Sequence, residues 1–365
     1  MTRRIVVVGA GIAGLACALA CARAGARVDV LEARPSIGHH PAHIDVVPSL
    51  LRDLARLGAA EACVRRGFAY SDLAVVDEHG DEGLRLPTPH LAGAQLPPAA
   101  GIALDDLLDV LAAASTQAAA VLHRGCAVRL VEPDSGRVVT DGRVFEADLV
   151  VLATGADSPL AGALFGPVKA AAARHSWWHA LLPRPPWLDR STWMAGSVGR
   201  RLLLVPIGMS RAGVAVIGTP ALREPADGPA LVRLLKSWGP LPRRIAEVME
   251  PATPTAPRLV ASALRETPWH RGAVLCVGAA AHAIAPPFGQ SAAQAVEDAV
   301  VLGELVAGQI ERPQLLQRFM ERRGARVRQL HGLTERAAHW MLHPEPATDL
   351  MQLAREINAL VSQPA

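Results

Sequence analysis

The sequence predicts an α/β fold: a discontinuous Rossmann-like domain with an inserted domain rich in β-sheet and with helices at the C-terminal end. Three observations predict it. A strand, a glycine turn (Gly9 to Gly14), a helix and a second strand open the chain. Residues 165–263 then read as short strands between Pro and Gly turns. A buried strand at residues 273–277 and two long helices follow.

The bulk composition limits the function classes. The chain has 365 residues, of which 50% are hydrophobic, enough for two folding units with a substantial core. A net charge of +3 without a dense Lys or Arg run argues against a nucleic-acid partner. Five cysteines, an odd number without a CxxC pair, argue against a disulfide framework or structural zinc and predict a cytoplasmic protein.

The first residues also resemble an export signal, because Arg3-Arg4 precede an apolar stretch that ends near Ala22. We favour a folded unit, since three glycines interrupt that stretch at a meaningful spacing. No apolar segment reaches the ~18 residues of a membrane span without such interruptions, and so we expect none.

The first unit is a βαβ of about 30 residues. Residues 5–8 form a buried strand, a helix runs to about residue 24 before Gly25, and residues 27–31 form a strand that ends on Glu32. The elements predicted next are an amphipathic helix at 48–58, strands at 70–77 and 84–86, a loop at 87–98, a helix at 105–120, and strands at 127–131, 137–140 and 149–152.

An antiparallel sheet is predicted beyond residue 165, interrupted by one helix at 229–238. Its strands are placed at 172–181, 193–198, 201–206 and 214–218, and the two final helices at 290–308 and 313–343. This order predicts a nucleotide-binding domain at 1–68, 100–163 and 266–312, a substrate domain at 69–99 and 164–265, and a helical segment at 313–365.

The glycine turn matches GxGxxG between a strand and a helix. Gly9 makes the tight turn, Gly11 lets a pyrophosphate approach the backbone at the helix N-terminus, and Gly14 allows close packing. Glu32 is placed to accept a hydrogen bond from an adenosine ribose. We therefore predict dinucleotide contacts along this unit, at Gly9, Gly11, Ile12, Ala13, Gly14, Glu32, Ala33 and Arg34. The motif does not separate FAD from NAD.

A second motif lies near the end of the chain. Residues 272–291, followed by Glu297-Asp298, contain Pro286-Pro287-Phe288-Gly289-Gln290 and resemble the flavin-contacting motif of class A flavoprotein monooxygenases, the p-hydroxybenzoate hydroxylase family. The strand at 273–277 delivers this loop to the sheet edge where ligands bind. The prolines stiffen it, and the helix from Gln290 points its N-terminus at the same place.

The resemblance implies FAD as cofactor and NAD(P)H as reductant. It implies that a flavin C4a-hydroperoxide transfers one oxygen atom to an aromatic or polyketide-like small molecule, with the protein supplying orientation and a dry pocket. It also implies further flavin contacts, at Thr154, Gly155, Gly278, Ala279, Phe288, Gly289, Gln290 and Ser291, with Pro286 and Pro287 in the catalytic loop.

The chain departs from the family pattern at four positions. Ala279 and Thr154 replace aspartates, Ala161 replaces an arginine, and Leu104 stands where an arginine commonly reaches the pyrophosphate. Losing the contacts of Ala279 and Leu104 would weaken FAD binding by about 2–4.5 kcal/mol, or roughly 30- to 2,000-fold, unless Arg34 or Arg52 compensates.

Histidines are further candidates. His39, His40 and His43 have no evident carboxylate partners, which favours loop or pocket polarity over a metal site. His175 and His179 could share a face of one strand, although Trp177 and Trp178 fit an ordinary strand equally well. One of these histidines could hydrogen-bond or deprotonate a phenolic substrate, and His179 is taken as the catalytic candidate. We expect His282 to satisfy backbone groups.

Several other residues could line the substrate cavity or belong to the core: Trp193, Leu203, Val205 and Pro206. Tyr70 is the only tyrosine, so a tyrosine relay has one candidate donor. The Arg-rich helix at 312–328 is a solvated face or part of a dimer contact, and the protein is expected to be a monomer or homodimer.

Three functions remain open at this point. The first is an FAD-dependent aromatic monooxygenase. The second keeps FAD but changes the reaction to an epoxidation, a Baeyer–Villiger oxygenation or a dehydrogenation. The third, motivated by Thr154, Ala279 and Leu104, is a degenerate homologue that acts as a pathway partner.

Overall fold

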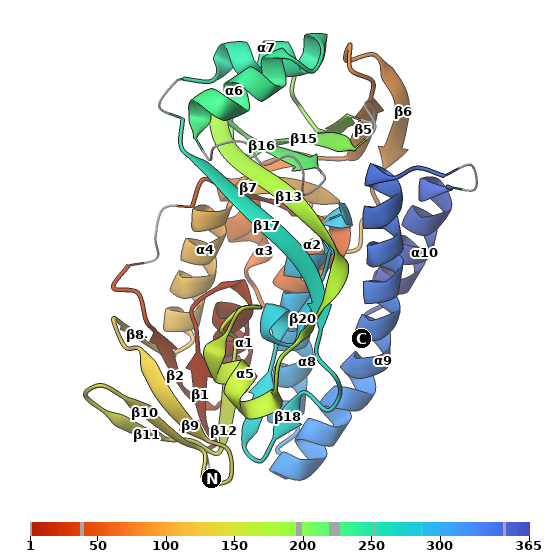
Figure 1. The fold of residues 1–365 in the computed structure, drawn as a ribbon. Coiled ribbons are helices and arrows are strands. Elements are labelled where there is room, and N and C mark those ends of the chain that lie inside the picture. The colour runs from red at the N-terminus through yellow and green to blue at the C-terminus, as the bar shows by residue number, and fades with distance from the viewer. Residues whose placement is uncertain are drawn as a thin grey trace.

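A computed structural model describes residues 2–36, 40–194, 199–218, 227–250, 253–285, 287–345 and 348–365. Its lower part in Figure 1 is a six-stranded sheet in the order β18-β19-β12-β1-β2-β8. Five neighbouring strands are parallel, and the edge strand β18 is antiparallel to β19. The bounds are β1 Arg4–Val8, β2 Arg27–Glu32, β8 Val121–Arg124, β12 Leu149–Leu152, β18 His270–Arg271 and β19 Val274–Cys276.

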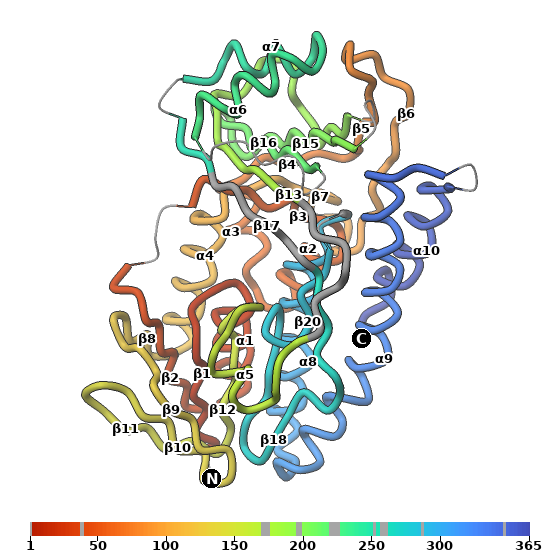
Figure 2. Tube along the Cα trace, in the orientation of Figure 1, coloured from red at the N-terminus to blue at the C-terminus, as the bar shows by residue number. Residues whose placement is uncertain are grey.

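Helices from opposite ends of the sequence lie together on this sheet. Helix α1 (Ile12–Arg23) packs along α8 (Gln290–Ala307), as Figures 1 and 2 both show, and α4 (Leu104–Gln117) packs against α1 as well. The approach of α1 and α8 is close, because a Cβ on Gly303 would lie 2.8 Å from the Ala20 Cβ. The helix that begins at the first glycine turn is thus packed on the helix that follows the second motif.

The upper part is an eight-stranded sheet in the order β20-β17-β13-β16-β15-β14-β5-β6. All its neighbours are antiparallel except β14 and β5. Its strands are β5 Asp72–Val76, β6 Glu82–Pro87, β13 Lys169–Pro183, β14 Ser191–Met194, β15 Arg200–Pro206, β16 Arg211–Gly218, β17 Thr255–Leu264 and β20 His282–Ala283.

The two faces of this large sheet have different neighbours. Helices α6 (Gly228–Lys236) and α7 (Pro240–Val248) cover the outer face, where Leu202 and Leu204 are buried. The alternate residues Leu203 and Val205 point to the inner face and pack with Tyr70, Ala99 and Ala103. Side chains therefore alternate along β15 between a core under α6 and α7 and the inner face, which packs on the rest of the molecule.

A small sheet, β3-β7-β4, meets the inner face. It consists of β3 (His43–Val46), β7 (Ala99–Ala103) and β4 (Phe68–Tyr70). A Cβ on Gly101 would lie 2.2 Å from the Pro206 carbonyl oxygen and 2.4 Å from the Val205 Cγ1. Only glycine lets β7 approach β15 this closely, and so the two sheets pack backbone against backbone at this point.

The C-terminal helices form a column along one side of the molecule, at the right in Figure 1. Helix α9 (Arg312–Leu342) packs on α8, and α10 (Leu350–Ser362) packs on α9. Among the described residues, no helix combines the length and the apolar run needed to cross a membrane. The remaining elements are α2 Pro48–Arg56, α3 Ala60–Arg66, β9 Val128–Glu132, β10 Arg137–Thr140, β11 Val144–Glu146, α5 Pro159–Phe165, η1 Gly278–Ala280 and η2 Pro287–Gly289.

The predicted α/β fold class is confirmed, with the parallel sheet, the antiparallel sheet and the final helices all present. The strand predicted at 70–77 is confirmed for Asp72–Val76, which is β5 in the large sheet, and is wrong at Tyr70, which ends β4 in the small sheet. Strand β14 ends at Met194, and the rest of the strand predicted at 193–198 lies outside the described residues. The domain boundaries stay a prediction.

Candidate functional site

The first glycine turn is as tight as the motif requires. Gly9 has φ +104°, and a Cβ there would lie 2.6 Å from the Ala153 carbonyl oxygen. A Cβ on Gly14 would lie 1.8 Å from the Gly9 carbonyl oxygen. Around Gly11, by contrast, a Cβ would meet nothing within 4 Å. Gly9 and Gly14 are thus needed for close packing. Gly11 instead borders open space at the N-terminus of α1, which no side chain caps.

Three turns from distant parts of the sequence meet at the carboxyl ends of the parallel strands. Gly278 follows β19 with φ +56°, and a Cβ there would lie 2.7 Å from the Ala13 Cβ, beside Ile12 at the start of α1. The turn after β12 reaches the same place, because Thr154 borders Gly9. Gly155 has φ +85° and faces open space. The structure therefore brings the two predicted motifs and Thr154-Gly155 together around one cradle.

Glu32 closes the cradle at the end of β2. Its carboxylate accepts hydrogen bonds from the backbone N–H groups of Ala10 (2.8 Å) and Arg34 (2.9 Å). Ala33 and Arg34 are exposed. The acid thus lies beside the glycine turn, where the prediction places the adenosine ribose.

Arg34 is the cation at this end of the cradle. Its Nη1 lies 3.1 Å from the His40 Nε2, and the His40 Nδ1 lies 2.9 Å from the Asp105 Oδ1. Since a guanidinium only donates, Nε2 accepts and the Nδ1–H donates to Asp105. The expectation that these histidines have no carboxylate partner is therefore wrong for His40, because the fold brings the start of α4 beside it. His39 lies outside the described residues.

Arg52, the other cation proposed to compensate for Leu104, is used elsewhere. Its Nη2 donates to Asp53 (2.8 Å) and Glu297 (3.1 Å), and its Nη1 donates to the Val361 carbonyl oxygen (2.8 Å). This buried guanidinium is not available to a phosphate, so of the two only Arg34 remains a candidate. Among the described residues, no cluster of three or more His, Cys, Asp or Glu side chains could hold a metal ion.

Thr154 and Ala161, two of the departures from the family pattern, have local structural roles. The Thr154 hydroxyl donates to the Ser158 Oγ (2.5 Å), and that oxygen caps α5 by accepting from the Ala161 N–H (3.1 Å). Ala161 is fully buried. Ala279 is partly exposed in the turn after Gly278, where its methyl group offers no hydrogen bond.

The predicted flavin loop precedes α8. Pro286 lies outside the described residues, and so does the side chain of Pro287. Phe288 has φ +69°, a left-handed conformation that is strained for a bulky residue and is typical of functional sites. Gly289 also has a positive φ, and a Cβ there would lie 2.8 Å from the Val47 Cγ1. The loop therefore lies directly on the chain that follows β3.

The start of α8 has unused polar groups. No side chain caps its N-terminus. The Gln290 amide donates to the Phe288 carbonyl oxygen (3.0 Å), whereas its Oε1 is buried without a partner among the described residues. Ser291 is exposed in the first turn. A buried unpaired acceptor beside a strained loop is what a missing ligand donor would leave.

The predicted substrate residues divide into two groups. Trp193 is partly exposed and stacks on Phe288, with ring centroids 6.5 Å apart. The large sheet thus touches the flavin loop through an aromatic pair. Leu203, Val205 and Pro206 are buried against the small sheet, which favours a core role, and their assignment to substrate stays a prediction.

His179 belongs to an aromatic group on the inner face. It stacks on Trp177 at 5.0 Å and meets the edge of His43 at 5.3 Å. His43, expected to supply loop or pocket polarity, is a buried strand residue: a Cβ on Gly213 would lie 2.2 Å from its ring, so glycine makes room for it. Burial lowers the pKa of His43 to about 4, so the imidazole is neutral at pH 7.

A buried ionic network, whose importance the sequence did not reveal, lies behind the cradle. Asp298 accepts from the Gly278 N–H (2.8 Å), the Arg323 Nε (2.7 Å) and the His282 Nε2 (2.6 Å), all with fully buried side chains. His282 therefore bonds a carboxylate, and the expectation that it serves backbone groups is wrong. Glu297 pairs with Arg323, Arg326 and Arg52. The sequence signal for this network is the Glu297-Asp298 pair that follows the second motif.

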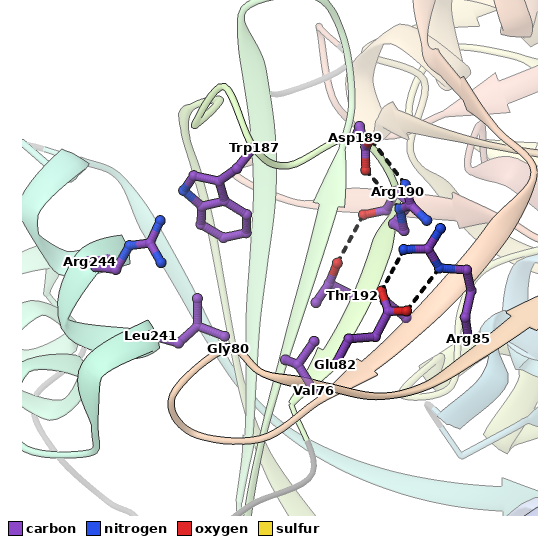
Figure 3. Close-up of a pocket in the computed structure, with 11 residues that line it drawn as sticks. Val76, Gly80, Glu82, Arg85, Trp187, Asp189, Arg190, Thr192, Leu241 and Arg244 are labelled. Carbon is purple, nitrogen blue, oxygen red and sulfur yellow. Dashed lines mark hydrogen bonds and ion pairs between the residues drawn. The ribbon is translucent and has the colours of Figure 1, made fainter.

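A hollow of roughly 320 Å³ opens elsewhere, beside α7 (Figure 3). Its charged walls are paired with one another: Arg85 with Glu82, and Arg190 with Asp189. Arg244 lies over the Trp187 ring at 5.0 Å. The lining residues of this hollow come from β5, β6, β14, α7 and the adjoining loops, and none of them belongs to the glycine cradle.

The chain is similar to known FAD-binding proteins. A family model described as FAD binding domain matches residues 2–334. The FAD-dependent urate hydroxylase of Klebsiella pneumoniae is 28% identical over 356 residues, which cover 90% of this chain and 87% of that protein. The 2-heptyl-3-hydroxy-4(1H)-quinolone synthase of Pseudomonas aeruginosa is 28% identical, over 92% of this chain and 90% of that protein. The crystal structure of K. pneumoniae HpxO with FAD and uric acid has a TM-score of 0.83 at 23% identity, covering 99% of this chain and 93% of that chain, and shows the same fold.

The cradle can be tested by filling it. In Gly11→Val the added methyl groups enter open space, so the free energy of unfolding of the apoprotein should change by about 1 kcal/mol or less. FAD affinity, measured by titration of flavin fluorescence, should fall at least about 100-fold, because the side chain occupies the space that a pyrophosphate needs. Gly142→Val, in an exposed turn with equally open space, is the control and should bind FAD as the wild type does. Unchanged FAD affinity in Gly11→Val would contradict the assignment.

His43 should make stability depend on pH. Its imidazole is neutral in the folded protein down to about pH 4, whereas in the unfolded chain it takes up a proton below about 6.5. Stability is therefore present above pH 6.5 and falls as pH drops toward 4, by about 3 kcal/mol from this group. Urea unfolding at pH 7 and 4.5 should show a smaller fall for His43→Gln than for the wild type. His339→Gln, at an exposed position, is the control and should lose as much stability as the wild type. An equal loss of unfolding free energy between pH 7 and 4.5 in all three proteins would contradict the role of His43.

Proposed function

Because the chain belongs to the FAD-binding-domain family and is an FAD-dependent monooxygenase of class A, we propose that it hydroxylates an aromatic or polyketide-like small molecule at the expense of NAD(P)H. The main support is the meeting of the two motifs. Gly278 of the second motif touches Ala13 of the first, which leaves one cradle with open space at Gly11 and Gly155.

The residues present fit an FAD molecule. Uncapped N–H groups at Ile12 and Ala13 face the open space at Gly11 and suit a pyrophosphate. Glu32 suits the adenosine ribose, and Arg34 adds a cation at the same end. The buried unpaired Gln290 Oε1 and the uncapped start of α8 suit the polar edge of a flavin ring.

The bound flavin supplies electron transfer from reduced nicotinamide to oxygen. The chain supplies position and exclusion of water. Trp193 stacks on Phe288 where the large sheet meets the flavin loop, so the substrate would lie between this pair and the inner face. His43, whose imidazole is neutral at pH 7, and His179 lie on that face.

The relatives' names favour a nitrogen heterocycle within this class. The urate hydroxylase and the heptylhydroxyquinolone synthase are both named for nitrogen-containing rings. We extend this chemistry to the present chain, whose inner face has buried polar groups among aromatic ones.

The proposal predicts three results. The purified protein reconstituted with FAD has a flavin spectrum, NADH or NADPH oxidation is faster with a suitable heteroaromatic substrate, and one atom of labelled O₂ enters the product. A flavin-bound protein whose product carries no label would be a dehydrogenase. No flavin binding at high FAD, or no turnover with either nicotinamide, would contradict the monooxygenase assignment and favour a partner role.

A further inference from the structure

A buried carboxyl group joins three elements beside the flavin loop. Asp45, on β3, accepts hydrogen bonds from the hydroxyls of Tyr70 on β4 and of Ser191 at the start of β14 (2.9 Å). The Tyr70 hydroxyl also lies 3.3 Å from the Ala100 carbonyl oxygen. Tyr70, the only tyrosine of the sequence, therefore orients the Asp45 carboxyl group.

Asp45 has no cationic partner among the described residues, in contrast to the paired Glu297 and Asp298. Burial raises the pKa of the Asp45 carboxyl, while the Tyr70 and Ser191 hydroxyls act in the opposite direction. A buried carboxyl group without a counter-charge is costly, and such groups concentrate at functional sites. Two neutral hydroxyls leave acceptor capacity on a carboxylate, which has about four lone-pair sites.

Asp45 lies next to the flavin loop. A Cβ on Gly289 would lie 3.2 Å from the Asp45 carbonyl oxygen. Ser191 is followed two residues later, on the same face of β14, by Trp193, which stacks on Phe288. Asp45 lies between the two sheets, and the residue as a whole is only partly buried.

A second, independent observation points to a ligand on this face. The Trp177 Nε1–H and the His43 Nδ1 are buried without hydrogen-bond partners among the described residues. His43 lies two residues from Asp45, on the same face of β3. Its ring contacts the His179 ring, which in turn stacks on Trp177. Unpaired buried polar atoms of this kind are uncommon in folded proteins unless a ligand or water fills the site.

We propose that Asp45, oriented by Tyr70 and Ser191, accepts a hydrogen bond from a ring N–H or O–H of the substrate and so selects hydroxylated or N–H heteroaromatic rings. The assignment rests on the proposed function, because it places the substrate ring between the flavin loop and the inner face. It makes Asp45 a specificity-determining residue that the sequence motifs do not contain.

The test compares ring donors with their methylated analogues on the FAD-loaded protein. The probes are 4(1H)-quinolone against 1-methyl-4-quinolone, and 2-naphthol against 2-methoxynaphthalene, with binding measured by perturbation of the flavin absorbance. The wild type should bind the donor of at least one pair about 10-fold or more tightly than its analogue, as a hydrogen bond to a charged group gives.

Asp45→Asn should reduce that preference to less than about 3-fold by weakening the donor probe, while FAD affinity stays within about 2-fold of wild type. Asp141→Asn is the control. It removes an exposed carboxylate that pairs with Arg129, beside a different sheet from the one that holds Asp45, and it should keep the preference for the donor probe. If Asp45→Asn does not fold, Asp45→Glu keeps the charge but moves it by one methylene, and only the donor probe should lose affinity.

Several outcomes would overturn the proposal: no preference in the wild type, no binding of any donor probe by FAD-loaded protein, an unchanged preference in Asp45→Asn, or equal losses for both probes in Asp45→Glu. A purely structural Asp45 would lower the melting temperature and leave the preference intact. Failure to bind FAD is visible in the flavin spectrum before any probe is added, and it would count against the proposed function instead.

Discussion

The Asp298 carboxylate is the contact on which the cofactor cradle depends. It accepts three hydrogen bonds at 2.6–2.8 Å, from Gly278, His282 and Arg323, and it is fully buried. Burial alone would raise its pKa, but the charges and hydrogen bonds around it hold the pKa near 2. The stability that this ionised group contributes is therefore present above about pH 4 and is lost as the pH falls toward 2. Removing one partner of such a buried pair typically costs about 3–5 kcal/mol, so the turn, α8 and α9 are held as one unit.

This arrangement explains how the site can tolerate its departures from the family pattern. Ala279 and Leu104 offer no side-chain hydrogen bond, whereas the Gly278 N–H of the turn donates to the buried Asp298 carboxylate. Gly278 of this turn also packs against Ala13 at the start of α1. In the function proposed above, FAD would be held mainly by the backbone of these turns and by Glu32, with Arg34 as the neighbouring cation.

The sequence predicted the parts whose signals are local. The first βαβ unit, its glycines and Glu32 could be located because turn geometry requires particular residues at fixed spacing. Strand β7 could not, since Ala99 to Ala103 is rich in small residues with low strand propensity and is stabilised by close packing on β15; β3 pairs with this strand. The carboxylate partners of His40 and His282, and the Glu297 partner of Arg52, come from distant parts of the sequence, which no local pattern encodes. Asp45 was missed for the same reason, because its partners lie 25 and 146 residues away.

The central claim is that Asp298, rather than side chains in direct contact with FAD, holds the flavin turn in its binding shape. The most direct measurement is the FAD dissociation constant of Asp298→Asn, which keeps the size of the side chain and removes its charge, against wild type and Asp141→Asn. The account predicts that FAD binds at least about 10-fold more weakly to a folded Asp298→Asn and normally to Asp141→Asn. An Asp298→Asn protein that folds and binds FAD with wild-type affinity would contradict it.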